Sequence, residues 1–226
     1  MKQRLNNKLR IIFTLTACMG LGVLLGRLGI DYWPTIKQAV VLKKEQYSTS
    51  NKTLNSRYHK EKTTVLDWAY LLPKEEHEVM TRYQSTNPKN LEQMTAQVLL
   101  SINSSTDQNY QNALISTNTV DRFEKKMVSI SGFAVPIDFY DDKSVKSFFF
   151  VPYFGACIHL PAPPPNQMIF VQLEPGFKDI DITQTYTLTG SIGLALFEDP
   201  MGTSAYTLDV VKIVEFYGQS DDFRRH

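Results

Sequence analysis

The sequence predicts a mainly β protein with helices on its N-terminal side, in which a membrane-anchor helix precedes a small OB-like β-barrel. Three observations predict this class: an uncharged apolar run near the N-terminus, a helical apolar spacing in the middle, and strand-like segments in the C-terminal half. A chain of 226 residues has room for an anchor, a linker and one globular domain of ordinary size.

The N-terminal region, residues 1–30, is typical of a signal anchor or transmembrane helix. Residues 1–10 include four basic side chains, and the stretch from Ile11 to Gly26 has no charge. The run reaches Ile30 and is long enough to span a bilayer if Arg27 extends to the far interface. The positive-inside rule then predicts an inner-membrane anchor with the soluble domain in the periplasm of a bacterial envelope.

Two alternatives remain for this region. The tetrapeptide ending in Cys18 (LTAC) resembles a lipobox, which would make the protein a lipoprotein, although the chain stays apolar after Cys18. A cleaved secretory signal is the other alternative. All three interpretations place the domain outside the cytoplasm.

The charge of the soluble part argues against nucleic acid as a partner. The first 30 residues contain five of the 24 basic residues and none of the 23 acidic ones, so the remainder has 19 basic and 23 acidic residues. Nucleic-acid-binding proteins concentrate basic side chains on one face, and this sequence shows no such concentration.

Two segments connect the anchor to the predicted barrel. Residues 31–63 are polar and without sustained periodicity, which predicts a linker. Residues 64–120 predict a helical packing segment, with a short turn ending at Pro73 and a helix starting at Asn87-Pro88. Five apolar residues recur there at helical spacing: Leu91, Met94, Val98, Leu99 and Ile102. We expect this face to be buried against the β domain rather than kept for a partner.

The C-terminal half, residues 121–218, predicts the barrel, and residues 219–226 a polar tail. Five strand-like segments follow one another: 127–135, 147–153, 168–173, 185–197 and 205–216. Five or six short strands over this length favour a small OB-like barrel, with a β-sandwich as the alternative.

Cys157 and His159 are the candidate metal ligands. They lie two residues apart, so in an extended segment both side chains point to the same side and could share zinc or copper. Two ligands are too few for a site, and the acidic residues that might complete it are Asp138, Asp141 and Glu198. The alternative is a buried thiol beside a hydrogen-bonded imidazole, without a metal.

An enzyme using Cys157 as nucleophile and His159 as base is the competing class. Such a pair needs a close hydrogen bond, a third orienting group and an oxyanion hole, which two residues on one strand supply poorly. The sequence has no Gly-x-Ser-x-Gly, His-Glu-x-x-His or Cys-x-x-Cys-His motif. A non-enzymatic protein is therefore expected.

The proline-rich segment, Pro161 to Pro165, is the candidate binding site for a partner protein. Its prolines favour a rigid polyproline II geometry, and the neighbouring amides could fix the loop through hydrogen bonds. Structural bracing of the loop is the alternative to partner docking. The candidate binding residues are Tyr153, Phe154, Pro163, Pro164, Pro165, Asn166 and Gln167.

These segments resemble an uncharacterised bacterial envelope family, domain of unknown function 3299. The resemblance extends from about Leu66 to Tyr217 and depends on PYFGACIH…PPPNQ, GFAVP and the Trp68…Pro73 element. Ala162 interrupts the proline run that the family usually has. The resemblance implies an accessory protein of an FtsX-type ABC transport system, in some cases linked to zinc supply. The expected function is therefore a membrane-anchored periplasmic binding protein that contacts such a permease, and the alternative is a metal carrier or thiol enzyme.

Overall fold

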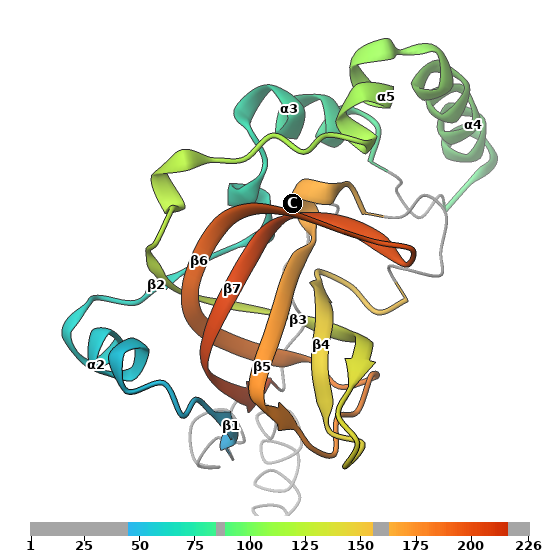
Figure 1. The fold of residues 1–226 in the computed structure, drawn as a ribbon. Helices are drawn as coiled ribbons and strands as arrows, with labels where there is room; N and C mark the ends of the chain where they lie inside the picture. Colours follow the sequence, from blue (N-terminus) through green and yellow to red (C-terminus); the bar gives the residue numbers. More distant parts are fainter. Residues whose placement is uncertain (1–44, 85–88, 156–162, 217–226) are drawn as a thin grey trace, which may run out of the picture. The chain divides into compact units, whose positions relative to one another are not determined.

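A closed five-stranded barrel forms the centre of the domain (Figure 1). The computed structural model describes residues 45–84, 89–155 and 163–216. The barrel strands are β3 (Met127–Phe139), β4 (Val145–Val151), β5 (Ile169–Phe177), β6 (Tyr186–Asp199) and β7 (Gly202–Glu215). Each overlaps one of the five segments predicted from the sequence, so the predicted strands are confirmed.

The strand order is that of a small Greek-key barrel of the OB type. β3 pairs antiparallel with both β4 and β6, and β4 pairs antiparallel with β5. β5 and β7 run parallel, and the antiparallel pair of β6 with β7 completes the circle. Closure removes the free edges that a sandwich would keep, which confirms the predicted OB-like barrel.

Side chains of the barrel strands alternate between an interior core and a second cluster on the outer face. On β4, Phe148 and Phe150 belong to the interior core, whereas Phe149 and Val151 belong to the outer cluster. All four are fully buried, which explains why β4 is a continuous apolar run rather than an alternating one. The outer cluster includes Phe197 of β6, whose ring stacks on that of Phe170 at 3.5 Å.

Part of the predicted linker belongs to the folded domain. Residues 45–65 form β1 (Glu45–Ser48), which pairs with β7, α2 (Lys52–Lys60), and β2 (Thr64–Val65), which pairs with β3. The prediction that the linker extends to Thr63 is therefore wrong. Tyr47 and Leu54 are the buried residues that attach this segment, and two isolated apolar residues are too few to give a periodic pattern.

Helices lie over one end of the barrel, as Figure 1 shows for α3 and α5. They are η1 (Trp68–Leu71), α3 (Lys74–Arg82), α4 (Leu91–Thr106), α5 (Gln108–Leu114), η2 (Asp121–Phe123) and, between β4 and β5, η3 (Pro165–Gln167). The turn predicted before Pro73 is η1, with Asp67 as its N-cap. A small separate core joins η1, α3 and α5 through Leu72, Met80 and Ala113.

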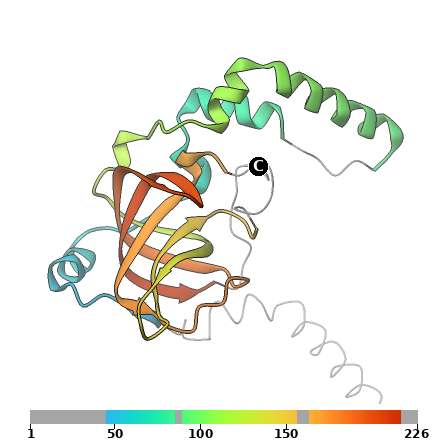
Figure 2. The same ribbon diagram turned by 45° about the vertical axis from the view of Figure 1, so that its right-hand side comes forward.

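The long helix α4 differs from the sequence prediction in its start and in its packing. It begins at Leu91 with Asn90 as N-cap, because the Asn90 side chain accepts the backbone N–H of Gln93, 2.8 Å away, and Gln93 accepts that of Lys89. No residue of α4 is buried, so the prediction that its apolar face packs against the β domain is wrong. Figure 2 shows α4 lying beyond the end of the barrel, next to α5.

The expected anchor (residues 1–30) and polar tail (219–226) lie outside the described residues. Among the residues that the structure describes, no helix is long and apolar enough to cross a membrane.

Candidate functional site

Two amide side chains of η3, those of Asn166 and Gln167, fix the proline-rich segment beneath the helices. Both residues are fully buried. The Gln167 amide donates to the carbonyl of Trp68 in η1 at 2.8 Å, and the Asn166 amide donates to Glu76 of α3 at 2.7 Å. The predicted anchoring of this loop by amide hydrogen bonds is confirmed. Pro163 and Pro164 are also buried, which agrees with bracing, while partner binding by this segment stays a prediction.

Glu76 joins three segments of the chain. Its carboxylate accepts hydrogen bonds from the Ser116 hydroxyl, the Asn118 amide and the Asn166 amide, each at 2.7 Å. These donors belong to the loop after α5 and to η3, so one partly buried carboxylate holds α3, that loop and η3 together. Hydrogen bonds to a charged acceptor are about twice as strong as those between neutral groups.

Replacing Glu76 by alanine is expected to lower the free energy of unfolding by about 1–3 kcal/mol, because three donors lose their acceptor. Glu75 is the matched control, since it is exposed and adjacent on α3. Glu75→Ala should change stability by less than about 0.5 kcal/mol. Urea titrations of both variants test this, and equal losses would contradict a special role for Glu76.

A buried tyrosine on β7 holds two further segments in place. The Tyr206 hydroxyl donates to the carbonyl of Leu71 at 2.8 Å and accepts the backbone N–H of Val120 at 2.7 Å. Burial raises the pKa of Tyr206 to about 12. Since Gln167 holds the other end of η1, both η1 and the loop before η2 have fixed positions relative to the barrel.

Two open pockets lie on opposite sides of α3. The first, here called the α3 pocket, has a volume of about 540 Å³, and its lining includes Tyr70, Leu72, Lys74, His77, Val120 and Arg122. The second has a volume of about 600 Å³, and its lining includes Glu75, Glu76, Asn109, Asn112, Ser116 and Asn118. The helix therefore presents basic side chains to one pocket and acidic side chains to the other.

The candidate metal ligands Cys157 and His159 lie outside the described residues, so zinc binding stays a prediction. Within residues 45–84, 89–155 and 163–216, no three His, Cys, Asp or Glu side chains are grouped closely enough to hold a metal ion. Asp138, one proposed further ligand, instead forms an ion pair with Lys146 at 2.7 Å, and that hydrogen bond lowers its pKa. Asp141 and Glu198 belong to no such group either.

The two predicted aromatic contact residues occupy different environments. Tyr153 is partly buried against the outer cluster of the barrel. Phe154 remains 51% exposed, with its ring at a centroid distance of 6.0 Å from that of Phe133. Phe154 therefore extends the apolar surface of the outer cluster, and its role in binding stays a prediction.

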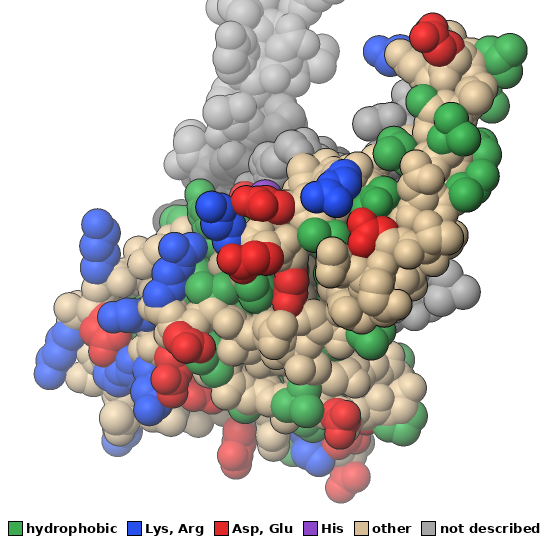
Figure 3. Space-filling model, turned by 90° about the horizontal axis from the view of Figure 1, so that it is seen from above, with side chains coloured by type: hydrophobic (Ala, Val, Ile, Leu, Met, Phe, Trp, Pro, Cys, Tyr) green, Lys and Arg blue, Asp and Glu red, His purple; other side chains and the backbone are tan. Residues whose placement is uncertain are grey.

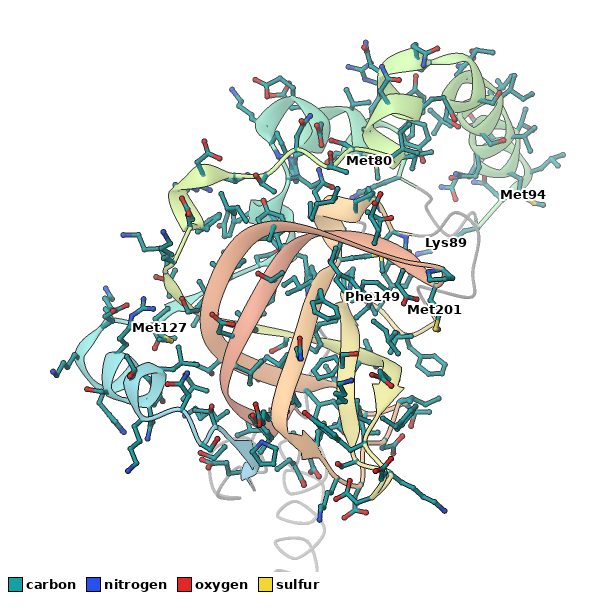
Figure 4. The ribbon with its side chains drawn as sticks, in the orientation of Figure 1. Met80, Lys89, Met94, Met127, Phe149 and Met201 are labelled. Atoms are coloured by element: carbon teal, nitrogen blue, oxygen red, sulfur yellow. The ribbon has the colours of Figure 1, made fainter. Side chains whose placement is uncertain are left out.

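The most exposed apolar surface among the described helices is on α4. We call it the α4 apolar face; it consists of Leu91, Met94, Val98, Leu99 and Ile102, whose exposed fractions range from 53% to 78%. In Figure 4, the side chain of Met94 points away from the barrel. In Figure 3, α4 carries a row of hydrophobic side chains, and charged ones appear only near its start.

Sequence reasoning identified the residues of the α4 apolar face but assigned them to the core. It did not single out Tyr70, Lys74, His77 or Arg122. These four come from three separate elements, and no spacing in the sequence brings them together.

Comparison with known proteins places this arrangement in a family. The family described as "Protein of unknown function (DUF3299)" matches residues 68–215, which run from η1 to the last residue of β7. The chain belongs to the DUF3299 family. A search of curated proteins gives no match. A DUF3299 family protein from Pseudomonas aeruginosa PAO1 is similar in structure, with 22% identity, a TM-score of 0.49, and coverage of 69% of this chain and 97% of the other.

The DUF3299 match includes η1, all of α3, α4 and α5, and the five barrel strands. It therefore contains the α3 pocket, the Glu76 hydrogen bonds and the α4 apolar face. β1, α2 and β2 precede the matched residues.

Proposed function

We propose that this DUF3299 protein is a non-enzymatic envelope protein, anchored in the inner membrane, that assists a transport complex by binding one of its membrane proteins through the α4 apolar face. The observation that carries the proposal is the face itself. Five large apolar side chains, each more than half exposed, lie on one helix. Contiguous exposed apolar surface of this kind is typical of protein interaction sites, whereas isolated apolar residues are common everywhere on surfaces.

The packing of α4 leaves this face accessible. Its contact with α5 uses the opposite side, where Gln97, Leu100 and Ser104 are partly buried and the Ser104 carbonyl accepts the side-chain amide of Gln111 at 2.9 Å. Asp107 ends α4 and caps α5, and its carboxylate accepts the Tyr83 hydroxyl at 2.8 Å. α4 is thus attached to the domain without using its apolar face.

The spacing and charge of the face favour a groove in a partner protein. Leu91, Met94, Val98 and Ile102 recur at intervals of three or four residues, the pattern with which an amphipathic helix enters an apolar groove. From Gln93 to Thr106 the helix has no charged side chain. A complementary partner surface would therefore also be apolar and uncharged, since burying an unpaired charge is costly.

The length of the preceding chain supports a partner in the membrane. Residues 31–44 separate the apolar N-terminal run from β1 and can extend to at most about 50 Å. An anchor at residues 11–30 would keep the domain within that distance of the bilayer. The resemblance to the DUF3299 family implies an FtsX-type ABC permease as the partner. Such a permease would lie within reach of the anchored domain.

We expect a photo-crosslinking side chain at Val98 or Ile102 to attach the full-length protein to an integral membrane transport protein in cells. Asn103 is the matched control, because it is exposed on α4 but lies off the apolar face. The double variant Val98→Ser/Ile102→Ser should abolish crosslinking from Leu91 and change stability by less than about 1 kcal/mol, since both residues are exposed. Mass spectrometry identifies the product.

Three results would contradict this proposal. Crosslinks to a second copy of the chain would assign the face to self-association, and crosslinks to lipid would assign it to the membrane surface. Equal crosslinking from Asn103 would show that the face has no specific partner.

A further inference from the structure

The α3 pocket has a charge opposite to that of the domain around it. Lys74, His77 and Arg122 line it, and no Asp or Glu is among its lining residues. Beyond residue 30, by contrast, the chain has 19 basic and 23 acidic residues. Basic side chains that line a concave site raise the local concentration of anions.

The basic side chains of this pocket are available to a ligand. In the described part of the chain, neither Arg122 nor His77 belongs to an ion pair. The Arg122 guanidinium lies 4.7 Å from the centre of the Phe123 ring and 6.0 Å from that of Tyr70, so aromatic rings hold it without neutralising it. Lys74 contacts Glu78 at 3.8 Å, and both side chains are more than 60% exposed, so this pair is weak.

The N-terminus of α3 lies at the pocket. Lys74 is the first residue of α3, Pro73 before it supplies no side-chain cap, and both line the pocket. A helix N-terminus has a partial positive charge. The two acidic residues of the first turn, Glu75 and Glu76, line the pocket on the other side of the helix. Lys74 and His77, three residues apart, share the side that faces the α3 pocket.

The walls of the α3 pocket are fixed before any ligand binds. Tyr206 holds the lining residue Val120 through a hydrogen bond of 2.7 Å, and it holds Leu71, which lies between the lining residues Tyr70 and Leu72, through one of 2.8 Å. Gln167 holds Trp68 at the start of η1. A preformed site loses little conformational entropy on binding, so even a small ligand can be retained.

Apart from Thr119, the remaining lining is apolar or aromatic. Leu72 is 4% exposed, Val120 is partly buried, and Tyr70 is 55% exposed. A volume of about 540 Å³ is in the range of pockets that hold small organic molecules. A ligand that fits therefore combines an anionic group with an apolar or aromatic portion.

We propose that the α3 pocket binds a phosphate-bearing organic molecule, with its phosphate among Lys74, His77 and Arg122 and its apolar portion against Tyr70, Leu72 and Val120. Three donors, two on α3 and one on η2, match the several acceptor oxygens of a phosphate better than the two of a carboxylate. The phosphate ester can come from a soluble metabolite or from a phospholipid headgroup. This site is separate from the α4 apolar face and does not depend on the function proposed for it.

Calorimetric titration of the full-length protein in a nonionic detergent with phenyl phosphate tests the proposal. We expect binding that is stronger than that of inorganic phosphate and that weakens as salt is added. Arg122→Gln and Lys74→Gln should each weaken phenyl phosphate binding about tenfold, in line with the loss of one charge-assisted hydrogen bond. Lys52→Gln is the control, because Lys52 is exposed on α2 and does not line the pocket.

Reconstitution into phosphatidylcholine nanodiscs separates the two sources of the phosphate, because this headgroup carries a phosphodiester but no net charge. If phenyl phosphate binds more weakly in these nanodiscs than in detergent, the site takes a lipid headgroup. If the affinity is equal in nanodiscs and detergent, the site takes a soluble phosphate ester. Absence of phenyl phosphate binding by the folded wild type, or equal affinity of Arg122→Gln, Lys74→Gln and wild type, would overturn the proposal.

Discussion

Replacing Trp68 by alanine is expected to lower the free energy of unfolding by about 3–5 kcal/mol, the range observed when a buried aromatic side chain is truncated. Trp68 is 1% exposed, and its ring lies 5.7 Å from that of Phe150 in the barrel core. Its indole N–H donates to the carbonyl of Ser131 on β3 at 2.7 Å. The substitution therefore leaves both a cavity and an unpaired carbonyl, and a urea titration measures the loss.

Trp68→Phe is the control that separates the two contributions. Phenylalanine keeps an aromatic ring but cannot donate to Ser131, so we expect it to lose about 1–2 kcal/mol. Gly132 next to Ser131 gives independent evidence of the close packing. A Cβ atom there would lie 2.4 Å from the carbonyl oxygen of Val151 and 3.0 Å from the Trp68 ring. A Trp68→Ala variant as stable as wild type would contradict this packing.

The barrel was the part of the fold that sequence reasoning predicted well. Strands reveal themselves through local periodicity, and the run through Phe148, Phe149 and Phe150 is buried on both faces, as its composition indicates. Closure of the barrel, however, depends on the parallel pairing of β5 with β7, which involves only Ile169–Tyr206 and Phe170–Thr207. Such a short pairing leaves no local pattern in the sequence. Closure of the barrel was therefore suggested only by the number of predicted strands, which is typical of small barrels.

The α4 apolar face shows where sequence reasoning fails. An apolar stripe at helical spacing looks the same in sequence whether it packs against a core or faces a partner. Here α3 and α5 build their own small core with Leu72, Met80 and Ala113, and α4 contributes no buried residue to it. The α3 pocket was missed for a related reason, because Tyr70, Lys74 and Arg122 come together only in three dimensions.

Replacing Tyr206 by phenylalanine is expected to lower the free energy of unfolding by about 2–4 kcal/mol at neutral pH. The change leaves the carbonyl of Leu71 and the backbone N–H of Val120 without their buried partner, and each unpaired group costs about 1–3 kcal/mol. The ring itself stays, so loss of packing adds little. Denaturation of the wild type and the variant at pH 7 measures the difference.

The same substitution is expected to change the response of stability to alkaline pH. Burial raises the pKa of Tyr206 from 10.0 to about 12, so the folded protein keeps a proton that the unfolded chain releases. The corresponding stability is fully present below pH 10 and is lost as the pH rises to about 12, up to about 2.7 kcal/mol for two pKa units. Tyr206→Phe lacks this loss, so its stability should fall less steeply over that interval.

The other buried tyrosines serve as an internal control for this comparison. Burial also raises the pKa values of Tyr47, Tyr110 and Tyr186, but wild type and variant share these groups, so their contributions cancel in the difference. The gap in stability between the two proteins should therefore narrow from pH 10 to pH 12. A constant gap would mean that the Tyr206 phenol titrates as it does in the unfolded chain, and would contradict its burial between η1 and the loop before η2.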